Sequence, residues 1–358
     1  MNFFTRKIFN SGDHFFALDL GDLSIRVLEL DRNGKNDKIK SFGYAAVPAG
    51  LIEDGRVMDK GKVAQIIAGA IKKSGPGRIS TKKVVCSLPE SKAFLRIINI
   101  PKVSEEEAYE AIKWELEANI PLTSDQIYFD WQFLEEKEGK QRVLTIAVSR
   151  EVVDEITETL SMAGLDVYGL ELESVSSTRS LIDADAKRED ISIIVDIGSK
   201  KTSFIISEGS VPCFTSSVPF SSQAITEIIC GKMSISREEA GRMAANAGIE
   251  YSLENSAVFS VVKPLLESLA AEIEKTADFY QTISKESQAV SRVILCGSGA
   301  NLKGIIPYLA ARLSREIMVG DPWTNLDFGN RLPIIDRENS VCFVTAVGLA
   351  LKDINYGN

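Results

Sequence analysis

Residues 16–27 read FALDLGDLSIRV, and residues 193–204 read IIVDIGSKKTSF. Each stretch is an apolar run, an Asp-aliphatic-Gly turn and a second apolar run, which is the pattern of two strands joined by a tight turn. Such a turn presents backbone N–H groups that can bind an anion. Because an Asp beside each turn would repel bare phosphate, the pair predicts a polyphosphate held from both sides, with Mg²⁺ between carboxylates and phosphate oxygens.

Composition and charge indicate a soluble globular protein. The 358 residues are 44% hydrophobic and 25% charged, with a formal net charge of −9, and this length suits two or three domains. The acidic balance argues against a nucleic-acid partner, because such proteins usually carry a basic face. The five cysteines have no CxxC spacing, which predicts reduced core residues in a cytosolic protein. His14 is the only histidine, which excludes His-rich metal sites.

No apolar run approaches the ~20 residues that a membrane-spanning helix needs. Residues 1–10 contain Phe3, Phe4, Ile8 and Phe9 beside two basic residues, but this run is too short for a signal peptide. Two interpretations stay open. The segment is either a short amphipathic element at a membrane surface or a terminus whose hydrophobic side chains dock on the domain.

Hydrophobic periodicity divides the chain into two similar halves, with an insertion in the first. Residues 15–90 predict strands followed by a helix, and residues 91–166 predict the order β-α-β-β-α. Ser104 and Glu107 form a capping box that begins the first helix of this insertion. Residues 191–219 again predict strands, with helices after them.

A third glycine-containing turn, residues 297–299, follows the apolar strand 293–296 and would let a flat nucleoside approach the backbone closely. Two other phosphate-binding motifs fail on spacing. The nearest match to a P-loop, residues 55–62, has five residues instead of four between its glycines, and Val63 replaces the Ser or Thr that would bind Mg²⁺. The third turn is not a dinucleotide-binding fingerprint, because Leu302 stands where its last glycine should be.

The order of the three turns resembles the actin-like ATPase superfamily, which includes actin and the sugar kinases. The resemblance implies an α/β, ribonuclease H-like fold, with two domains of duplicated mixed sheets flanked by helices around a nucleotide cleft. It also implies ATP and Mg²⁺ as cofactors. Asp19 and Asp196 match the acidic residues near Mg²⁺; Gly21, Asp22, Leu23, Ser24 and Arg26 match the first phosphate loop; Gly198, Ser199, Lys200 and Thr202 match the second; and Gly297, Ser298, Gly299, Asn301 and Leu302 match the adenosine motif.

Three further positions bear on this resemblance. Asp22 departs from the family pattern, which usually has a small residue or a hydroxyl there. Its extra carboxylate either weakens phosphate binding or holds Mg²⁺ through water. Ala346 and Gly348 match the small residues of the second helix that connects the two domains.

The insertion identifies the branch of the superfamily. It resembles the 1C subdomain of FtsA and PilM, and residues 100–102, 111–115 and 120–121 are similar to the PilM family, the cytoplasmic ATP-binding proteins of type IV pilus assembly. The implied parts are a first actin-like domain (1A) at 1–90, 167–190 and 340–358; the 1C-type subdomain at 91–166; a second domain (2A) at 191–220 and 291–339; and a helical or mixed 2B subdomain at 221–290.

Membership of this family would make the chain a scaffold rather than a fast enzyme. The resemblance implies an ATP-binding component of the inner-membrane assembly platform, peripheral to the inner face of the cell membrane, with slow hydrolysis or none. Its implied partner is the N-terminal peptide of the inner-membrane protein PilN, bound in a groove between 1C and 1A. Other pilus proteins and copies of the chain itself are further candidate partners. Trp114 either lies near this groove or is a large core residue of its helix.

Hydrolysis would need a side chain that orients a water molecule in line with the γ-phosphate. The superfamily supplies this group near the start of the first connecting helix, which makes Glu171 the catalytic candidate and Glu173 the second. Their alternation predicts that both lie on one face of an extended segment. A solvated strand edge is the other interpretation of the same pattern.

Three other functions stay open. An FtsA-like protein that polymerises at the membrane is disfavoured, because FtsA normally ends in an amphipathic helix and residues 351–358 are too short for one. A cytoplasmic component of a type II secretion machine is disfavoured by the missing transmembrane helix. A sugar kinase is disfavoured by the 1C-type insertion.

Overall fold

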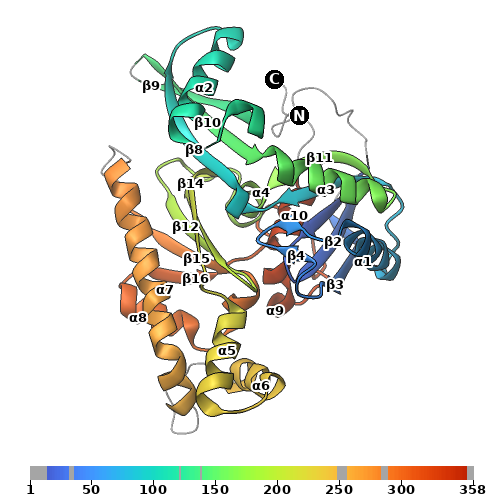
Figure 1. Cartoon of the computed structure of the whole chain (residues 1–358). Coiled ribbons are helices and arrows are strands. Elements are labelled where there is room, and N and C mark those ends of the chain that lie inside the picture. The colour runs from blue at the N-terminus through green and yellow to red at the C-terminus, as the bar shows by residue number, and fades with distance from the viewer. Residues whose placement is uncertain are drawn as a thin grey trace.

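The computed structural model describes residues 14–31, 36–120, 122–137, 139–247, 256–283 and 289–352. Two lobes, each built on a β-sheet with helices on its faces, flank a central pair of helices, α4 (Glu173–Leu181) and α10 (Val344–Ala350) (Figure 1). The predicted surface segment at residues 1–10 lies outside the described residues, as does the chain end after residue 352.

The first lobe contains a six-stranded sheet in the order β11-β7-β1-β2-β3-β6. Its strands are β1 (Phe16–Leu20), β2 (Ser24–Asp31), β3 (Lys38–Ala46), β6 (Gly75–Pro76), β7 (Lys83–Leu88) and β11 (Asp166–Leu172). β1 and β2 form the hairpin predicted from residues 16–27, with Leu18 opposite Val27. Because neighbouring side chains of a strand point to opposite faces, Leu18 packs toward α1 (Lys60–Lys73) and α3 (Arg150–Met162), and Ala17 packs toward α10.

The second lobe repeats this arrangement. β12 (Ile191–Ile197) and β13 (Thr202–Glu208) form the hairpin predicted from residues 193–204, β14 (Val211–Val218) extends it, and β15 (Arg292–Cys296) pairs in parallel with β12, as β7 does with β1. β16 (Glu316–Val319) completes this side. The helices α7 (Ser256–Ile283) and α8 (Ile305–Leu313) bury its core, and α5 (Ser222–Met233) and α6 (Arg237–Ala247) lie at the end away from the insertion (Figure 1).

The insertion, here called the inserted unit (residues 93–162), contains β8 (Ala93–Pro101), α2 (Glu105–Asn119), β9 (Ile127–Lys137), β10 (Lys140–Ser149) and α3. The predicted capping box is present: the Glu107 carboxylate accepts a hydrogen bond of 3.0 Å from Ser104 N, and Ser104 Oγ accepts one from Glu107 N. β8 pairs with β14 at Arg96 and Phe214. The strands of the inserted unit therefore extend the sheet of the second lobe, in the order β16-β15-β12-β13-β14-β8-β10-β9.

Two features depart from the sequence-based expectations. Trp323, Leu326 and Phe328 fall in the predicted second domain but pack against the core of the first lobe, so we place the boundary near residue 320. A short hairpin of β4 (Ile52–Glu53) and β5 (Arg56–Val57) was not predicted. The rest of the predicted division into four parts stays a prediction. Among the described residues, no helix is long and apolar enough to cross a membrane.

Candidate functional site

The three predicted glycine turns meet at one cleft between the lobes. Of the residues expected to bind nucleotide or metal, the cleft is lined by Asp19, Gly21, Asp22, Leu23, Ser24, Arg26, Asp196, Gly198, Ser199, Lys200, Gly297 and Ser298. Further lining comes from Gly55, Pro89, Glu173, Lys201 and four residues near the C-terminus, Val341, Cys342, Val344 and Thr345. Segments far apart in the sequence thus contribute to one site.

The first two turns have the same geometry. The N–H of Gly21 donates to the carbonyl of Ser24 at 2.9 Å, and the N–H of Gly198 donates to the carbonyl of Lys201 at 3.0 Å. A Cβ atom at residue 198 would lie 2.9 Å from that carbonyl oxygen, which explains the glycine. Each turn follows a largely buried strand that carries an Asp, and the two turns and their Asp residues line the same cleft.

The third turn needs glycine for two reasons. Gly297 has a φ of +78°, and a Cβ atom there would lie 2.2 Å from Oδ1 of Asp196. Gly299 packs directly on Ile197, where a Cβ atom would lie 2.1 Å from the side chain. The backbone at 297–299 therefore packs directly against Asp196 and Ile197, the residues that precede the second turn.

Four predicted binding residues do not line the cleft but hold its turns in place. Thr202 is buried, and its hydroxyl donates to the carbonyl of Phe220 at 2.9 Å. The Asn301 amide donates to the carbonyl of Glu338 at 2.6 Å. Leu302 packs against the second-lobe core, and Gly299 lies under the turn. Their structural positions support the cleft indirectly.

Three carboxyl groups with restricted solvent access gather in the cleft: Asp19 is buried, and Asp196 and Glu173 are partly buried. Burial raises the pKa of Asp19, although Arg26 opposes the shift. Burial and the charge of Asp19 together raise the pKa of Asp196 to about 6. Burial raises the pKa of Glu173 to about 8, and the charges of Asp19 and Asp196 add to this effect while Lys201 opposes it. Acids that resist ionisation in this way would be relieved by a bound cation.

The carboxyl groups fit a metal ion that is coordinated partly by a bound ligand and not by protein side chains alone. Within the described ranges, no group of three or more His, Cys, Asp or Glu side chains has metal-site geometry. Mg²⁺ in nucleotide sites usually takes one or two carboxylates and completes its shell with water and phosphate oxygens. Asp19 and Asp196 are suited to this role, because one comes from each lobe.

Arg26 provides a positive charge at the same place. Its guanidinium donates to Ser24 Oγ at 2.9 Å and to Asp19 Oδ2 at 3.4 Å, and it lies over the rings of Tyr44 and Phe343. Its Nε–H is buried without a hydrogen-bond partner. An orphaned buried donor is costly, so this part of the cleft fits an anionic ligand.

Asp22 has a structural task. Its carboxylate accepts hydrogen bonds from the backbone N–H groups of Asp54, at 3.1 Å, and Gly55, at 2.9 Å. The Lys200 ammonium lies 3.9 Å from Asp22 Oδ2 and 3.5 Å from the carbonyl of Ile52. The departure from the family pattern at this position therefore attaches the β4–β5 hairpin to the rim of the cleft.

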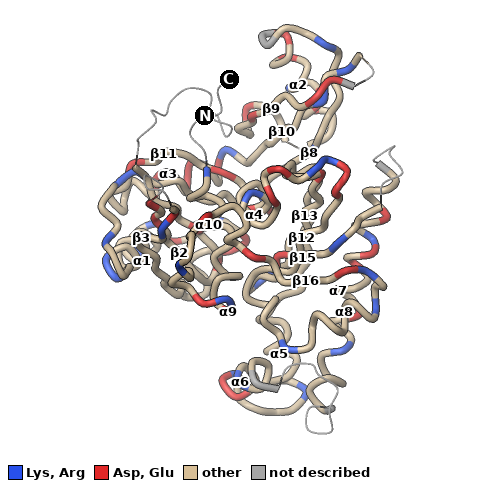
Figure 2. Tube along the Cα trace, turned by 180° about the vertical axis from the view of Figure 1, so that it is seen from behind, with Lys and Arg blue, Asp and Glu red and all other residues tan. Residues whose placement is uncertain are grey.

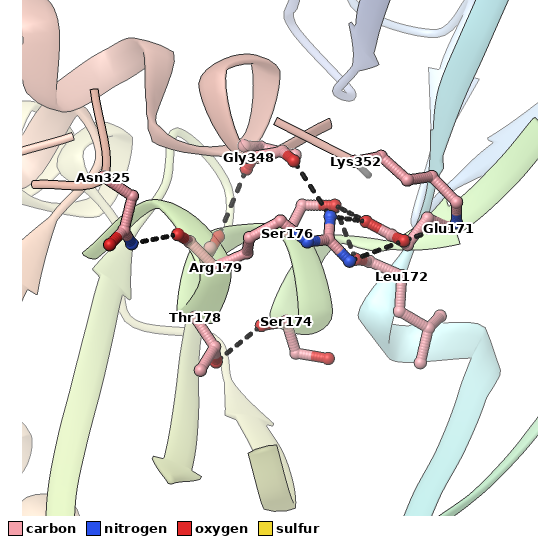
Figure 3. Close-up of polar contacts among 11 residues, drawn as sticks. Glu171, Leu172, Ser174, Ser176, Thr178, Arg179, Asn325, Gly348 and Lys352 are labelled. Atoms are coloured by element: carbon pink, nitrogen blue, oxygen red, sulfur yellow. Dashed lines mark hydrogen bonds and ion pairs between the residues drawn. The ribbon is translucent and has the colours of Figure 1, made fainter. Parts of the chain in front are cut away.

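Glu171, the first candidate for catalysis, is not among the residues that line the cleft. Figure 3 shows its carboxylate between Arg179 and Lys352, with Ser176 donating to it at 2.9 Å. Burial alone would raise the pKa of Glu171, but the two cations outweigh it and hold the pKa at about 2. Glu171 does not line the cleft, and its oxygens are engaged. We therefore transfer the catalytic proposal to Glu173.

Glu173 stands at a different element from Glu171. β11 ends at Leu172 and α4 begins at Glu173, so the predicted common face of an extended segment is wrong. One oxygen of Glu173 accepts from the backbone N–H of Glu90 at 3.2 Å, and Glu90 in turn accepts from the N–H of Ser174 at 3.2 Å. Glu173 lines the cleft beside both aspartates.

Trp114 is not a core residue, because 72% of its surface is exposed on α2. Nearby, Tyr109 contacts the rings of Phe129 and Trp131 at centroid distances of 5.2 and 6.0 Å. This excludes the core interpretation of Trp114 and leaves its relation to a partner groove as a prediction.

Sequence reasoning missed Lys201 and residues 89–91. Lys201 is adjacent to Lys200 in the second turn, and turn position alone did not distinguish the two. Residues 89–91 follow a strand and carry no recognisable motif. Only the folded chain brings Pro89 into the cleft, Glu90 to Glu173 and Ser91 to Lys201.

Comparison with known proteins gives a consistent result. The family profile described as "Type IV pilus assembly protein PilM" matches residues 17–354. The solved PilM–PilN type IV pilus biogenesis complex is similar with a TM-score of 0.81 and 23% identity, over 95% of this chain and 98% of that chain. The ethanolamine utilization protein EutJ from Carboxydothermus hydrogenoformans has a TM-score of 0.57 at 17% identity, over 96% of this chain and 90% of that chain.

MreB5 of Spiroplasma citri, in a structure bound to AMPPNP, has a TM-score of 0.53 at 11% identity over 95% of each chain. Together with the repeated lobes, these likenesses confirm the predicted actin-like α/β fold.

Proposed function

The chain belongs to the PilM family of type IV pilus assembly proteins, and from this premise we propose that it is a cytoplasmic ATP-binding scaffold of a pilus assembly platform. One observation carries the ATP proposal: two glycine turns with the same hydrogen bond, one from each lobe, line one cleft together with three carboxyl groups and a partly buried arginine. Anion-binding turns beside cation-seeking acids suit a polyphosphate bound with a divalent cation.

Each part of the ligand has residues suited to it. The turns at Gly21 and Gly198, with Arg26 and Lys200, would bind the phosphates. Asp19 and Asp196 would hold Mg²⁺, which shields the charge of the phosphates. The backbone at Gly297 and Ser298 would approach the adenosine. The AMPPNP-bound relative of the same fold supports this assignment by analogy.

We propose that hydrolysis, if the protein performs it, is slow. Glu173 is the group positioned to orient a water molecule. Because burial raises its pKa to about 8, the carboxyl group is mostly protonated at neutral pH without a bound cation. A protonated carboxyl group cannot accept a proton from water, which limits general-base catalysis.

The proposed partner is the N-terminal peptide of a PilN-like inner-membrane protein, held between the inserted unit and the first lobe. The similarity to a solved PilM–PilN complex supports it, and this partner would keep the protein at the inner face of the membrane. Nucleic acid is not a proposed partner. Figure 2 shows Lys and Arg interspersed with Asp and Glu along both lobes rather than gathered on one of them.

Calorimetric titration with MgATP and with a synthetic PilN N-terminal peptide tests both parts. We expect the wild type to bind both. Asp196→Ala removes a metal ligand and should lower MgATP affinity by at least about tenfold while peptide binding in the absence of nucleotide is retained. Unchanged affinity in Mg²⁺ buffer would contradict the metal role, and no peptide binding would contradict the pilus assignment.

A further inference from the structure

A four-residue segment, Pro89–Lys92, leads from β7 of the first lobe to β8 of the inserted unit; we name it the crossing segment. Pro89 lines the cleft. Gly55, in the hairpin that Asp22 holds, packs so closely that a Cβ atom there would lie 2.4 Å from Cβ of Pro89. The connection to the inserted unit is therefore also a wall of the cleft.

The second lobe contacts the crossing segment through Lys201. The Lys201 ammonium donates to Oγ of Ser91 at 2.9 Å, and the Ser91 hydroxyl donates to the carbonyl of Asp54 at 3.4 Å. Lys201 makes no ion pair with a carboxylate in the part of the chain that the structure describes, whereas its neighbour Lys200 lies 3.9 Å from Asp22. A cleft cation whose partner is a neutral hydroxyl can transfer to an anionic ligand at little cost.

Lys201 lies close enough to the carboxyl groups of the cleft to affect their pKa values. After burial, Lys201 is the strongest influence on Glu173, and it also opposes the raised pKa of Asp196. The contacts of the crossing segment agree with this: Ser91, which accepts from Lys201, follows Glu90, whose backbone N–H donates to Glu173 at 3.2 Å. Lys201 therefore lies beside Glu173, the group proposed to orient the attacking water.

We propose that Lys201 binds the terminal phosphate of ATP. To do so it gives up its hydrogen bond to Ser91, which shifts the crossing segment and thereby changes the conformation of the inserted unit. The inference rests on the proposed ATP function and adds a regulatory link to it: the inserted unit, which is the proposed partner site, would distinguish ATP from ADP.

The attachments of the inserted unit make it responsive to such a change. On one side, the crossing segment is anchored by Glu90: its backbone N–H donates to the Glu173 carboxylate, and its own carboxylate accepts from the N–H of Ser174 at the start of α4. On the other side, β8 continues the second-lobe sheet at β14, and Arg142 pairs with the buried Glu208 at 2.8 Å. The inserted unit is thus attached to both lobes, so a shift of Ser91 relative to Lys201 would change its position between them.

The first experiment compares nucleotides in Lys201→Met. We expect MgATP affinity to fall by about tenfold, the usual cost of a lost hydrogen bond to a charged group, and MgADP affinity to change by less than about twofold. Lys275→Met, an equivalent change at an exposed lysine of α7, serves as control and should leave both affinities unchanged. An equal loss for ATP and ADP overturns the terminal-phosphate assignment while leaving the proposed ATP function standing.

The second experiment measures amide hydrogen exchange in β8 and β10 with saturating MgATP or MgADP. We expect the wild type to change exchange in these strands with ATP more than with ADP. Ser91→Ala, which removes the resting partner of Lys201, should show the ATP-like exchange without nucleotide. Ser161→Ala, at an exposed position of α3, is the matched control and should behave as the wild type.

The outcomes separate the two proposals. If Ser91→Ala behaves as the wild type, or if ATP binds without changing β8 and β10, the link to the inserted unit is overturned and the ATP function remains. If the wild type binds neither nucleotide, both proposals fail.

Discussion

Glu171 and Glu173 are two residues apart, and their environments move their pKa values in opposite directions. Glu171 is buried between Arg179 and Lys352, which hold its pKa at about 2. Glu173 faces other acids, and its pKa rises to about 8. The first is therefore a fixed structural anion, and the second is the group whose ionisation can respond to a ligand in the cleft.

The raised pKa of Glu173 predicts a pH-dependent cost to stability. A carboxyl group with a higher pKa in the folded state binds protons more tightly when folded, so its ionisation destabilises the apo protein as pH rises from about 4.5 to about 8. Glu173→Gln should remove this cost. We expect the variant to be more stable than the wild type by about 3–5 kcal/mol at pH 9, with almost no difference at pH 4.5.

Denaturant unfolding of the nucleotide-free protein at pH 4.5, 7 and 9 measures this difference. A gap that is constant across the pH range would show that Glu173 is not the titrating group.

At the scale of elements, the crossing of α4 and α10 fixes the distance between the lobes. A Cβ atom at Gly348 would lie only 1.8 Å from the carbonyl oxygen of Ser176, so the two helices touch backbone to backbone. Arg179 strengthens the contact by donating to the carbonyl of Gly348 at 2.9 Å (Figure 3). Asn325 donates to the carbonyl of Arg179 at 2.8 Å and joins the loop after β16 to α4.

Gly348→Ala should separate these helices. Because the obstacle is backbone rather than a flexible side chain, we expect a loss of at least about 2 kcal/mol in the free energy of unfolding. Gly69→Ala, in α1, is the control, since no atom lies within 4 Å of a Cβ there, and it should raise stability by about 0.5–1 kcal/mol. Equal effects of the two substitutions would contradict the close crossing. Chemical denaturation measures both.

At the scale of the whole molecule, the inserted unit connects the two lobes. α3 packs its buried face, including Val153 and Ile156, into the first-lobe core. On the opposite side, Glu208 of the second lobe accepts hydrogen bonds from Arg142 at 2.8 Å, Arg188 at 3.0 Å and Tyr280 at 3.1 Å. The inserted unit is thus held by apolar packing on one lobe and by a buried ion cluster on the other.

Arg142→Met tests the second attachment. Removing one member of a buried ionic cluster is costly, but Glu208 keeps Arg188 and Tyr280, so we expect a loss of about 1–3 kcal/mol and faster amide exchange in β8 and β14. Lys102→Met breaks an exposed pair with Glu136 and should cost less than about 1 kcal/mol. If β8 and β14 exchange as in the wild type, the cluster does not hold the inserted unit.

Local chemistry explains what the sequence alone determined. The hairpins at 16–27 and 193–204, the third turn and the capping box at Ser104 depend on residues close in the chain, and their glycines and polar caps specify them directly. The repetition of the hairpin predicted two related lobes whose turns line one cleft, which we propose binds a polyphosphate.

Only the tertiary structure decided which side chains face that site. Glu171 is removed from it by Lys352, a residue 181 positions away, and Asp22 is occupied by the backbone of a hairpin that the sequence did not reveal. The pairing of β8 with β14 and the ion pair of Arg142 with Glu208 join the inserted unit to the second lobe, and both connect residues far apart in the sequence. The physical reason is that burial and charge pairing, which set a side chain's role, depend on neighbours that folding brings from distant segments.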